Sequence, residues 1–294
     1  MQLRLVLLGG GNALGQALVR LGAEDDISFL APKPEQGAWD AASLTSLIDD
    51  VRPDAVINLA YYYDWFQAGA VDPLHFVPQE RAIERLAQLC KHYDCILLQP
   101  SSYRVFDGAR ATAYNETNEC KPLSPRGQAL MRMEQGVRSL CSKHVLLRFG
   151  WLLDDSPEGM LGRVLRRAQD HELIEMADDR RGNPTPVEDA ARVILAILKQ
   201  LDCAAPLWGT YHYGGQEAAT VLSVAQAILA EAQAWRPQLS QNVEPHAHAS
   251  FADALIEPQH GVLDSRKITH TFGIKPRAWR TGLSDLLDSY YRNV

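Results

Sequence analysis

Short apolar runs alternate with longer stretches of helical periodicity through the first half of the chain. The runs of strand length are residues 3–8, 27–31, 54–60, 95–98 and 145–149. Between them, apolar residues recur at helical spacing, which predicts helices over 13–21, 44–48, 83–90 and 130–140. Apolar strands separated by helices form parallel sheets with right-handed crossovers. The pattern therefore predicts an α/β fold built on a doubly wound parallel sheet.

A later segment carries the sharpest helix start of the chain. Thr185, Pro186 and Glu188 suit the cap, the first helical position and the capping-box position, in that order. The helix that follows has an apolar stripe at Val187, Ala190, Ile194, Ile197 and Leu201. A stripe of this spacing is typical of a helix with one buried face.

Beyond residue 205 the pattern is looser, apart from one clear helix over 221–232. We therefore expect one domain over 1–150 and a smaller lobe over 151–294, with segments at about 183–205 returning to the sheet. Two features fall in this half. An exposed charged loop is expected at Asp178, Asp179, Arg180 and Arg181, and a strand near the smaller lobe at Trp208, Tyr211, His212 and Tyr213.

Composition narrows the classes of partner. The 294 residues are 46% hydrophobic and 22% charged, which is typical of a folded globular chain. The net charge of −7, without clustered Lys and Arg, argues against nucleic acid as a partner. The apolar start is too short for a membrane span and begins too directly for a signal peptide. Five scattered cysteines form no Cys-x-x-Cys pair, and His246 and His248 have no third ligand at a metal spacing. We expect a cytoplasmic protein without a metal, and no nucleic acid or membrane as a partner.

A glycine-rich loop joins the first strand to the first helix. It reads Gly9, Gly10, Gly11, Asn12, Ala13, Leu14 and Gly15. In this position glycines let the backbone turn tightly and approach a pyrophosphate, which the helix N-terminus then binds. Asn12 stands where such loops often have glycine, and asparagine tolerates left-handed backbone. The loop predicts a Rossmann-type dinucleotide site, and a tight turn without a ligand is the alternative.

The end of the second strand bears on which dinucleotide is preferred. Ala31, Pro32, Lys33 and Pro34 offer no carboxylate for a ribose 2′-hydroxyl, whereas Lys33 could meet a 2′-phosphate. The residues therefore favour NADP(H) over NAD(H). A solvated loop lysine is the alternative for Lys33.

Several longer segments resemble those of a known family. They are residues 52–60, 101–108, 145–151, 182–185 and 263–268. Residues 101–108 read Ser-Ser-Tyr-Arg-Val-Phe-Asp-Gly and are similar to the motif Ser-Thr-Asp-Tyr-Val-Phe-Asp-Gly. The chain resembles the extended short-chain dehydrogenases, and within them the dTDP-4-dehydrorhamnose reductases, nearly from end to end. The resemblance implies that Asn58, Leu59, Ala60 and Ser101 lie beside the cofactor.

The resemblance ends at the catalytic residues. The family uses a tyrosine to donate a proton, a lysine to hold the nicotinamide ribose, a serine or threonine to bond the substrate oxygen, and an asparagine to fix the lysine. By position, Ser102 matches the hydroxyl residue, but the tyrosine, lysine and asparagine positions hold Arg126, Leu130 and Gln79. Arginine remains protonated near neutral pH, and leucine cannot bond a ribose. The usual reduction is therefore not expected.

Two alternatives use neighbouring residues. A relocated acid such as Tyr103 could replace the missing tyrosine, with Tyr114 or residues 61–63 as other candidates and Lys121 as the ammonium. Independently, Arg104 and Arg126 could bind a phosphate or carboxylate, together with Tyr103. Packed aromatic residues and surface arginines are the plainer interpretations.

Two hypotheses of function follow. The first is an NAD(P)(H)-binding relative of these reductases with a degenerate tetrad, which senses a ligand or regulates an unidentified protein partner and binds a nucleotide sugar or another anionic small molecule. The second is an active NADP(H)-dependent oxidoreductase on a nucleotide sugar or related carbonyl compound. A pure interaction surface without either ligand is a third possibility.

Overall fold

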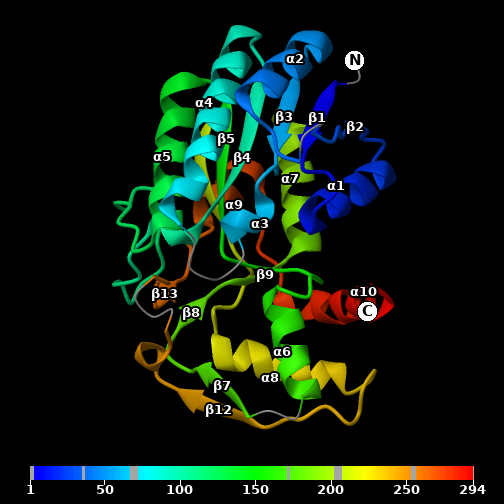
Figure 1. The fold of residues 1–294 in the computed structure, drawn as a ribbon, viewed down its shortest axis with the longest axis vertical. Helices are drawn as coiled ribbons and strands as arrows, with labels where there is room; N and C mark the ends of the chain where they lie inside the picture. Colours follow the sequence, from blue (N-terminus) through cyan, green and yellow to red (C-terminus); the bar gives the residue numbers. More distant parts are fainter. Residues whose placement is uncertain are drawn as a thin grey trace.

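The computed structural model describes residues 3–34, 37–66, 72–170, 173–201, 207–252 and 256–293. One large sheet dominates it, with the strand order β10-β5-β4-β3-β1-β2 and parallel pairing throughout (Figure 1). The strands are β1 (Leu5–Leu8), β2 (Phe29–Leu30), β3 (Ala55–Asn58), β4 (Ile96–Ser102), β5 (His144–Phe149) and β10 (Gly209–Tyr213). Every residue of β1, β3 and β5 is buried, as expected for a parallel sheet covered on both faces. The predicted doubly wound α/β fold is confirmed.

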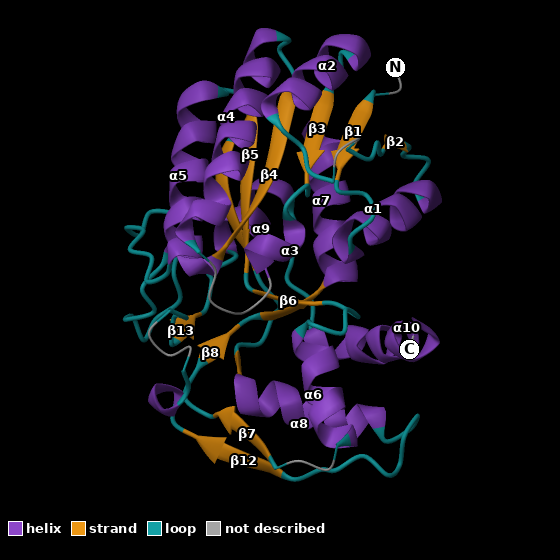
Figure 2. Cartoon of the chain, viewed as in Figure 1, coloured by secondary structure: helices purple, strands orange, loops and turns teal. Residues whose placement is uncertain are grey.

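Helices cover both faces of this sheet (Figure 2). One face carries α2 (Ala41–Val51), α4 (Val77–His92) and α5 (Pro125–Leu140), and the other carries α1 (Ala13–Glu24), α7 (Val187–Leu201) and α9 (Arg266–Phe272). The strand order reverses between β1 and β3. In open α/β sheets the crevice outside the carboxyl ends of such strands is where ligands bind.

A smaller group of elements lies beyond the carboxyl edge of the sheet (Figure 1). Its helices are α6 (Met160–Gln169), α8 (Val221–Ala232) and α10 (Leu283–Asn293). Its short strands pair as β6 (Trp151–Leu153) with β9 (Pro184–Pro186), β7 (Ile174–Ala177) with β12 (Val243–His246), and β8 (Arg181–Gly182) with β11 (Ala219–Thr220) and β13 (His260–Gly261). Within the described residues, no helix has the length and apolarity that crossing a bilayer requires.

Three details of the second half differ from the sequence prediction. Thr185 is not a helix cap: it lies in β9, and its hydroxyl donates to the carbonyl of Asn183 and accepts from the amide of Gly215. The segment 209–213 joins the central sheet beside β5 instead of the smaller lobe. Arg180 is largely buried in an ion pair, so residues 178–181 are not simply an exposed loop. The apolar stripe of α7 is buried as predicted.

Candidate functional site

The glycine loop lies at the point where the strand order reverses. Gly9 has a φ of 82°, and a Cβ there would lie 2.2 Å from the carbonyl oxygen of Leu59. At Gly15 a Cβ would meet the carbonyl oxygen of Gly9 at 2.4 Å. These two glycines are required by backbone contacts. Gly11 differs, because it is exposed and a Cβ there would have no atom within 4 Å.

Asn12 has a structural role in this loop. Its backbone is extended, with φ of −84°, so the tolerance of asparagine for left-handed backbone is not what selects it here. Its side chain caps α1, accepting from the amide of Gly15 and donating to the carbonyl of Leu59, both at 2.9 Å. Asn12 therefore ties the loop to the end of β3. The amides of Ala13 and Leu14, also in the first turn of α1, precede the amide of Gly15 that Asn12 caps.

The other residues expected beside a cofactor differ in how exposed they are. Lys33 is exposed after β2. Asn58, at the end of β3, donates to Oε1 of Gln99 at 2.7 Å and accepts from the amide of Ala60. Ser101 is fully buried, and its hydroxyl donates to Glu134 of α5 at 2.6 Å. The side chain of Ser101 is thus committed to the protein interior.

Two of the four tetrad positions are fully buried. Ser102 has no exposed surface, and its hydroxyl oxygen accepts from the amide of Arg104 at 3.4 Å. Leu130 also has no exposed surface and belongs to the hydrophobic core. Position 130 therefore contributes packing, and no polar group reaches from it to the cleft.

The other two tetrad positions converge on one residue of α3 (Tyr62–Phe66), Asp64. The Nε of Arg126 donates to the carbonyl oxygen of Asp64 at 2.6 Å. The Nε2 of Gln79 donates to the Asp64 carboxylate at 2.9 Å. Residues that stand in place of the tyrosine and the asparagine thus fix the same short helix.

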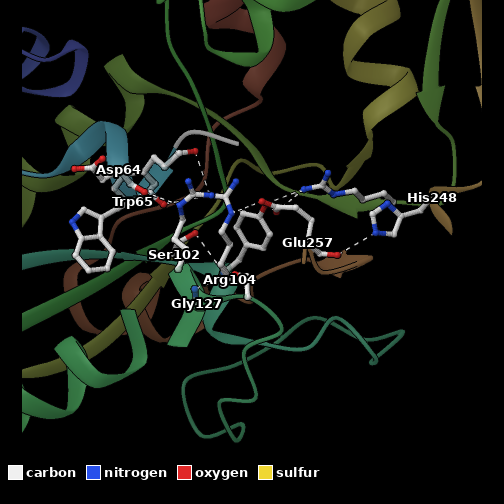
Figure 3. Close-up of polar contacts among 12 residues, drawn as sticks. Asp64, Trp65, Ser102, Arg104, Gly127, His248 and Glu257 are labelled. Carbon is white, nitrogen blue, oxygen red and sulfur yellow. Dashed lines mark hydrogen bonds and ion pairs between the residues drawn. The ribbon is translucent and has the colours of Figure 1, made fainter. Parts of the chain in front are cut away.

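A buried ion cluster adjoins this helix (Figure 3). Arg104 donates to Glu257 at 2.8 Å and to the carbonyl oxygens of Trp65 and Phe66 at 3.4 and 3.2 Å. Glu257 also accepts from Arg180 at 2.7 Å. Burial alone would raise the pKa of Glu257, but Arg104 and Arg180 hold it below its ordinary value. No sequence motif pointed to Glu257.

Arg126 is the second cation beside this cluster. Burial and the neighbouring charge of Arg104 lower the pKa of Arg126 to about 10. The guanidinium therefore remains protonated near neutral pH. It can donate hydrogen bonds there, but it cannot serve as a proton donor in the manner of a tyrosine.

The tyrosines considered as relocated acids have other partners. Tyr103 donates to Glu257 at 2.9 Å, and burial raises the pKa of its phenol. The hydroxyls of Tyr61, Tyr62 and Tyr114 donate to Trp39, Asp154 and Asp107. Lys121 pairs with Glu119 at 2.8 Å, with more than half of its side chain exposed, so it does not join Tyr103. Among the described residues, the alternative pairing of Tyr103 with Lys121 is not assembled.

A cavity of about 680 Å³ opens between the edge of the sheet and the smaller lobe. Tyr103, Arg104 and Trp151 line it on one side, and Arg163, Arg166 and Arg167 of α6 on the other. Arginines of this kind can recognise anionic ligands. Among the described residues, no group of three His, Cys, Asp or Glu side chains is arranged to hold a metal.

Comparisons with known proteins agree with this architecture. The family model described as RmlD substrate binding domain matches residues 3–292. A dTDP-4-dehydrorhamnose reductase of Aggregatibacter actinomycetemcomitans is 27% identical over 289 residues, which cover 96% of this chain and 98% of that protein.

Two solved structures show how far the fold is shared. The dTDP-4-dehydrorhamnose reductase from Bacillus anthracis, in complex with NADP, has a TM-score of 0.86 and 21% identity, covering 98% of this chain and 100% of its own. The Bordetella bronchiseptica enzyme WbmG, in complex with NAD and UDP, has a TM-score of 0.79 and 16% identity, covering 100% and 96%.

Proposed function

Because the chain belongs to the RmlD substrate binding domain family, we propose that it binds a dinucleotide and an anionic, nucleotide-sugar-like ligand without carrying out the ketone reduction of its relatives. Its role is then to sense these ligands or to regulate a protein partner. Four of its cysteines, Cys90, Cys95, Cys120 and Cys141, are free thiols, which fits a reducing cytoplasm. Cys203 lies outside the described residues.

The observation that carries the proposal is the reuse of the tetrad positions. Gln79 and Arg126 both bond Asp64, and Leu130 packs in the core. Ketone reduction requires a proton donor beside the substrate oxygen, and general acid catalysis typically contributes about 10²–10⁴-fold. A guanidinium with a pKa of about 10, bonded to a backbone carbonyl, supplies no such proton.

Dinucleotide binding is supported by the turn at Gly9 and the open surface at Gly11. Exposed Lys33 after β2, with no carboxylate beside it in residues 31–34, favours NADP(H) over NAD(H). The Bacillus anthracis relative was solved with NADP. The 2′-phosphate would meet Lys33, and the pyrophosphate would meet the N-terminus of α1.

The second ligand is assigned to the cavity of about 680 Å³. Its arginine lining suits a diphosphate or carboxylate, and the WbmG enzyme was solved with UDP as well as NAD. A nucleotide sugar, or another anion of that size, is the class of ligand we propose. Arg163, Arg166 and Arg167 of α6 line this cavity together, and they are the arginines we assign to the anion. Arg166 also pairs with Glu158, which lines the same cavity.

The test is turnover of NADPH with dTDP-4-dehydrorhamnose, beside a calorimetric titration with NADPH. We expect saturable binding and no oxidation above the enzyme-free rate. Robust oxidation that Tyr103→Phe abolishes and Arg126→Ala leaves intact would establish the alternative, an active oxidoreductase with a relocated acid. A titration without saturable binding, or binding that Gly11→Asp leaves unchanged, would refute dinucleotide binding.

A further inference from the structure

Two arginines hold the carboxyl end of α3. Arg126, from α5, donates to the carbonyl oxygen of Asp64, and Arg104, from the end of β4, donates to those of Trp65 and Phe66. The last carbonyls of a helix have no partner within the helix, so arginine side chains are favourable donors to them. We call these contacts the α3 clamp. Figure 3 shows Arg104 between Glu257 and the Asp64–Trp65 backbone.

Side chains from other elements hold the rest of α3. The Asp64 carboxylate accepts from Gln79 and from Nε2 of His75, both at 2.9 Å. The hydroxyl of Tyr62 donates to Asp154 at 3.0 Å, which ties the helix to the segment after β6. The helix is therefore bonded to α4, to α5 and to the smaller lobe. It has a defined position against the sheet.

The space under α3 is nearly filled. A cavity of about 10 Å³ remains between this helix and the residues of β3 and β4 beneath it, including Asn58 and Gln99. This is about the room that one water molecule needs. Ser102, the residue that would bond the substrate oxygen, is fully buried at the end of β4. Because α3 packs over the carboxyl ends of β3 and β4, a nicotinamide ring placed at that edge of the sheet would have to displace it.

The opposite end of the cleft is open. Gly11 is exposed, and a Cβ there would touch nothing within 4 Å. The hydroxyl of Tyr63, a residue that is 42% exposed, lies near the amide of Ala13 at the start of α1. A phosphate oxygen can replace an exposed phenol at a helix N-terminus at little cost. The phosphate end of the cleft, at Gly11, is therefore open to a ligand, whereas α3 fills the end where the nicotinamide ring would lie.

We propose that the cleft binds the adenosine-phosphate half of a dinucleotide and excludes the nicotinamide ring, with Arg126 as a positioning residue of the α3 clamp. This inference rests on the dinucleotide site of the proposed function and specifies its ligand as an adenine nucleotide with phosphate groups. The arginine in place of the catalytic tyrosine then keeps the redox half of the ligand out.

Calorimetric titration of the wild-type chain tests the inference. The two ligands are NADP⁺ and adenosine 2′,5′-bisphosphate, the adenine half of NADP⁺. We expect dissociation constants that agree within about threefold, because the nicotinamide half adds no contact. NADP⁺ binding about tenfold tighter or more would overturn the exclusion while leaving the dinucleotide site intact. Binding of neither ligand would overturn both this inference and the proposed nucleotide site.

A variant tests the clamp itself. Arg126→Ala should strengthen NADP⁺ binding by about tenfold, because α3 is released, and leave binding of the bisphosphate unchanged. Arg132→Ala is the matched control, since Arg132 lies on the same helix in an exposed pair with Glu80. Tyr62→Phe, which removes only the bond to Asp154, is a second and milder release should Arg126→Ala not fold. Unchanged NADP⁺ affinity in a folded Arg126→Ala chain would refute the clamp.

Discussion

A leucine at position 130 has a physical consequence for any attempt to restore the reductase tetrad. The side chain is fully buried in the hydrophobic core, on the face of α5 that contacts the sheet. A lysine at this site would place an ammonium group in the hydrophobic core that Leu130 now fills. Such a group loses its hydration, and its pKa falls.

We therefore predict that Leu130→Lys lowers the free energy of unfolding by about 3 kcal/mol or more at pH 7. The double change with Arg126→Tyr should not create a reductase, because Ser102 stays fully buried and α3 still packs over the ends of β3 and β4. Urea denaturation measures the loss, and Leu130→Met, which keeps an apolar side chain, should lose less than about 1.5 kcal/mol. A Leu130→Lys chain as stable as wild type would show that position 130 has access to water.

Arg126 and Arg104 show how two buried cationic side chains can lie close together. The guanidinium of Arg126 lies near that of Arg104, and this repulsion contributes to the lowered pKa of Arg126. Glu257 and Asp64 supply the opposing charge, in the first case by a direct bond to Arg104. The identity of residue 126 was readable from the sequence, but its partner was not. That partner is a backbone carbonyl, which carries no residue-type signal.

At the scale of elements, the glycine loop contains glycines with two different roles. Gly9 and Gly15 are required for folding, since a Cβ at either would overlap backbone atoms. Gly11 faces open space, so the fold tolerates a side chain there. Function and stability can therefore be tested apart within one loop.

We predict that Gly11→Asp weakens binding of adenosine 2′,5′-bisphosphate by about tenfold or more, because the carboxylate repels phosphate at the N-terminus of α1. The free energy of unfolding should change by no more than about 0.5 kcal/mol. Titration calorimetry and urea denaturation measure the two effects. Gly11→Ala is the control for size, and equal affinity in Gly11→Asp would place the phosphate elsewhere.

A buried charged network joins α5, β5 and β10. Glu134 bonds Arg148, and Arg148 donates to Nε2 of His212 at 3.2 Å. Burial and the charge of Arg148 lower the pKa of His212 from 6.5 to about 3. The imidazole is thus neutral in the folded chain but takes up a proton in the unfolded chain below about pH 6.5.

Because the unfolded chain binds this extra proton, stability from His212 is complete above about pH 6.5 and is lost as the pH falls toward about 3. One such proton amounts to about 1.4 kcal/mol per pH unit. We predict that His212→Gln, which can still bond Arg148 and the Tyr114 carbonyl, reduces the slope of stability against pH by about 1 kcal/mol per unit between about pH 6 and pH 5. Urea titrations at several pH values give the slope, and identical slopes in both chains would refute a buried neutral His212.

The elements themselves were largely predictable, because parallel strands and packed helices leave periodic apolar patterns. The stripe of α7 and the helix over 221–232 are where the sequence placed them. The helix cap predicted at Thr185 was wrong, because β9 pairs with β6 and this pairing places Thr185 in a strand. The strand over 209–213 was recognised, but its place beside β5 depends on pairing across the sheet, which no local pattern records.

At the scale of the molecule, Glu257 joins the two parts of the chain. It lies just before β13 in the smaller lobe, and it bonds Arg104, 153 residues earlier at the end of β4, as well as Arg180. Only 1% of Glu257 is exposed. A contact between such distant residues gives no signal in a single sequence, which is why this part of the candidate site was missed.

The ion pairs of Glu257 with Arg104 and Arg180 lead to a prediction about the stability of the whole molecule. Glu257→Gln removes the charge that balances two largely buried arginines, and breaking a buried ion pair from one side is strongly destabilising. We predict a loss of about 3 kcal/mol in the free energy of unfolding at pH 7, measured by urea denaturation. Binding of NADP⁺ should also change, because Arg104 no longer holds α3 in one position.

The control for Glu257→Gln is Glu119→Gln, which removes an exposed partner of Lys121 and should cost less than about 0.5 kcal/mol. If Glu257→Gln costs no more than this control, the cluster does not join the lobe to the sheet. Arg104 would still be held by its bonds to the α3 carbonyls. In that case the clamp on α3 would be independent of the smaller lobe.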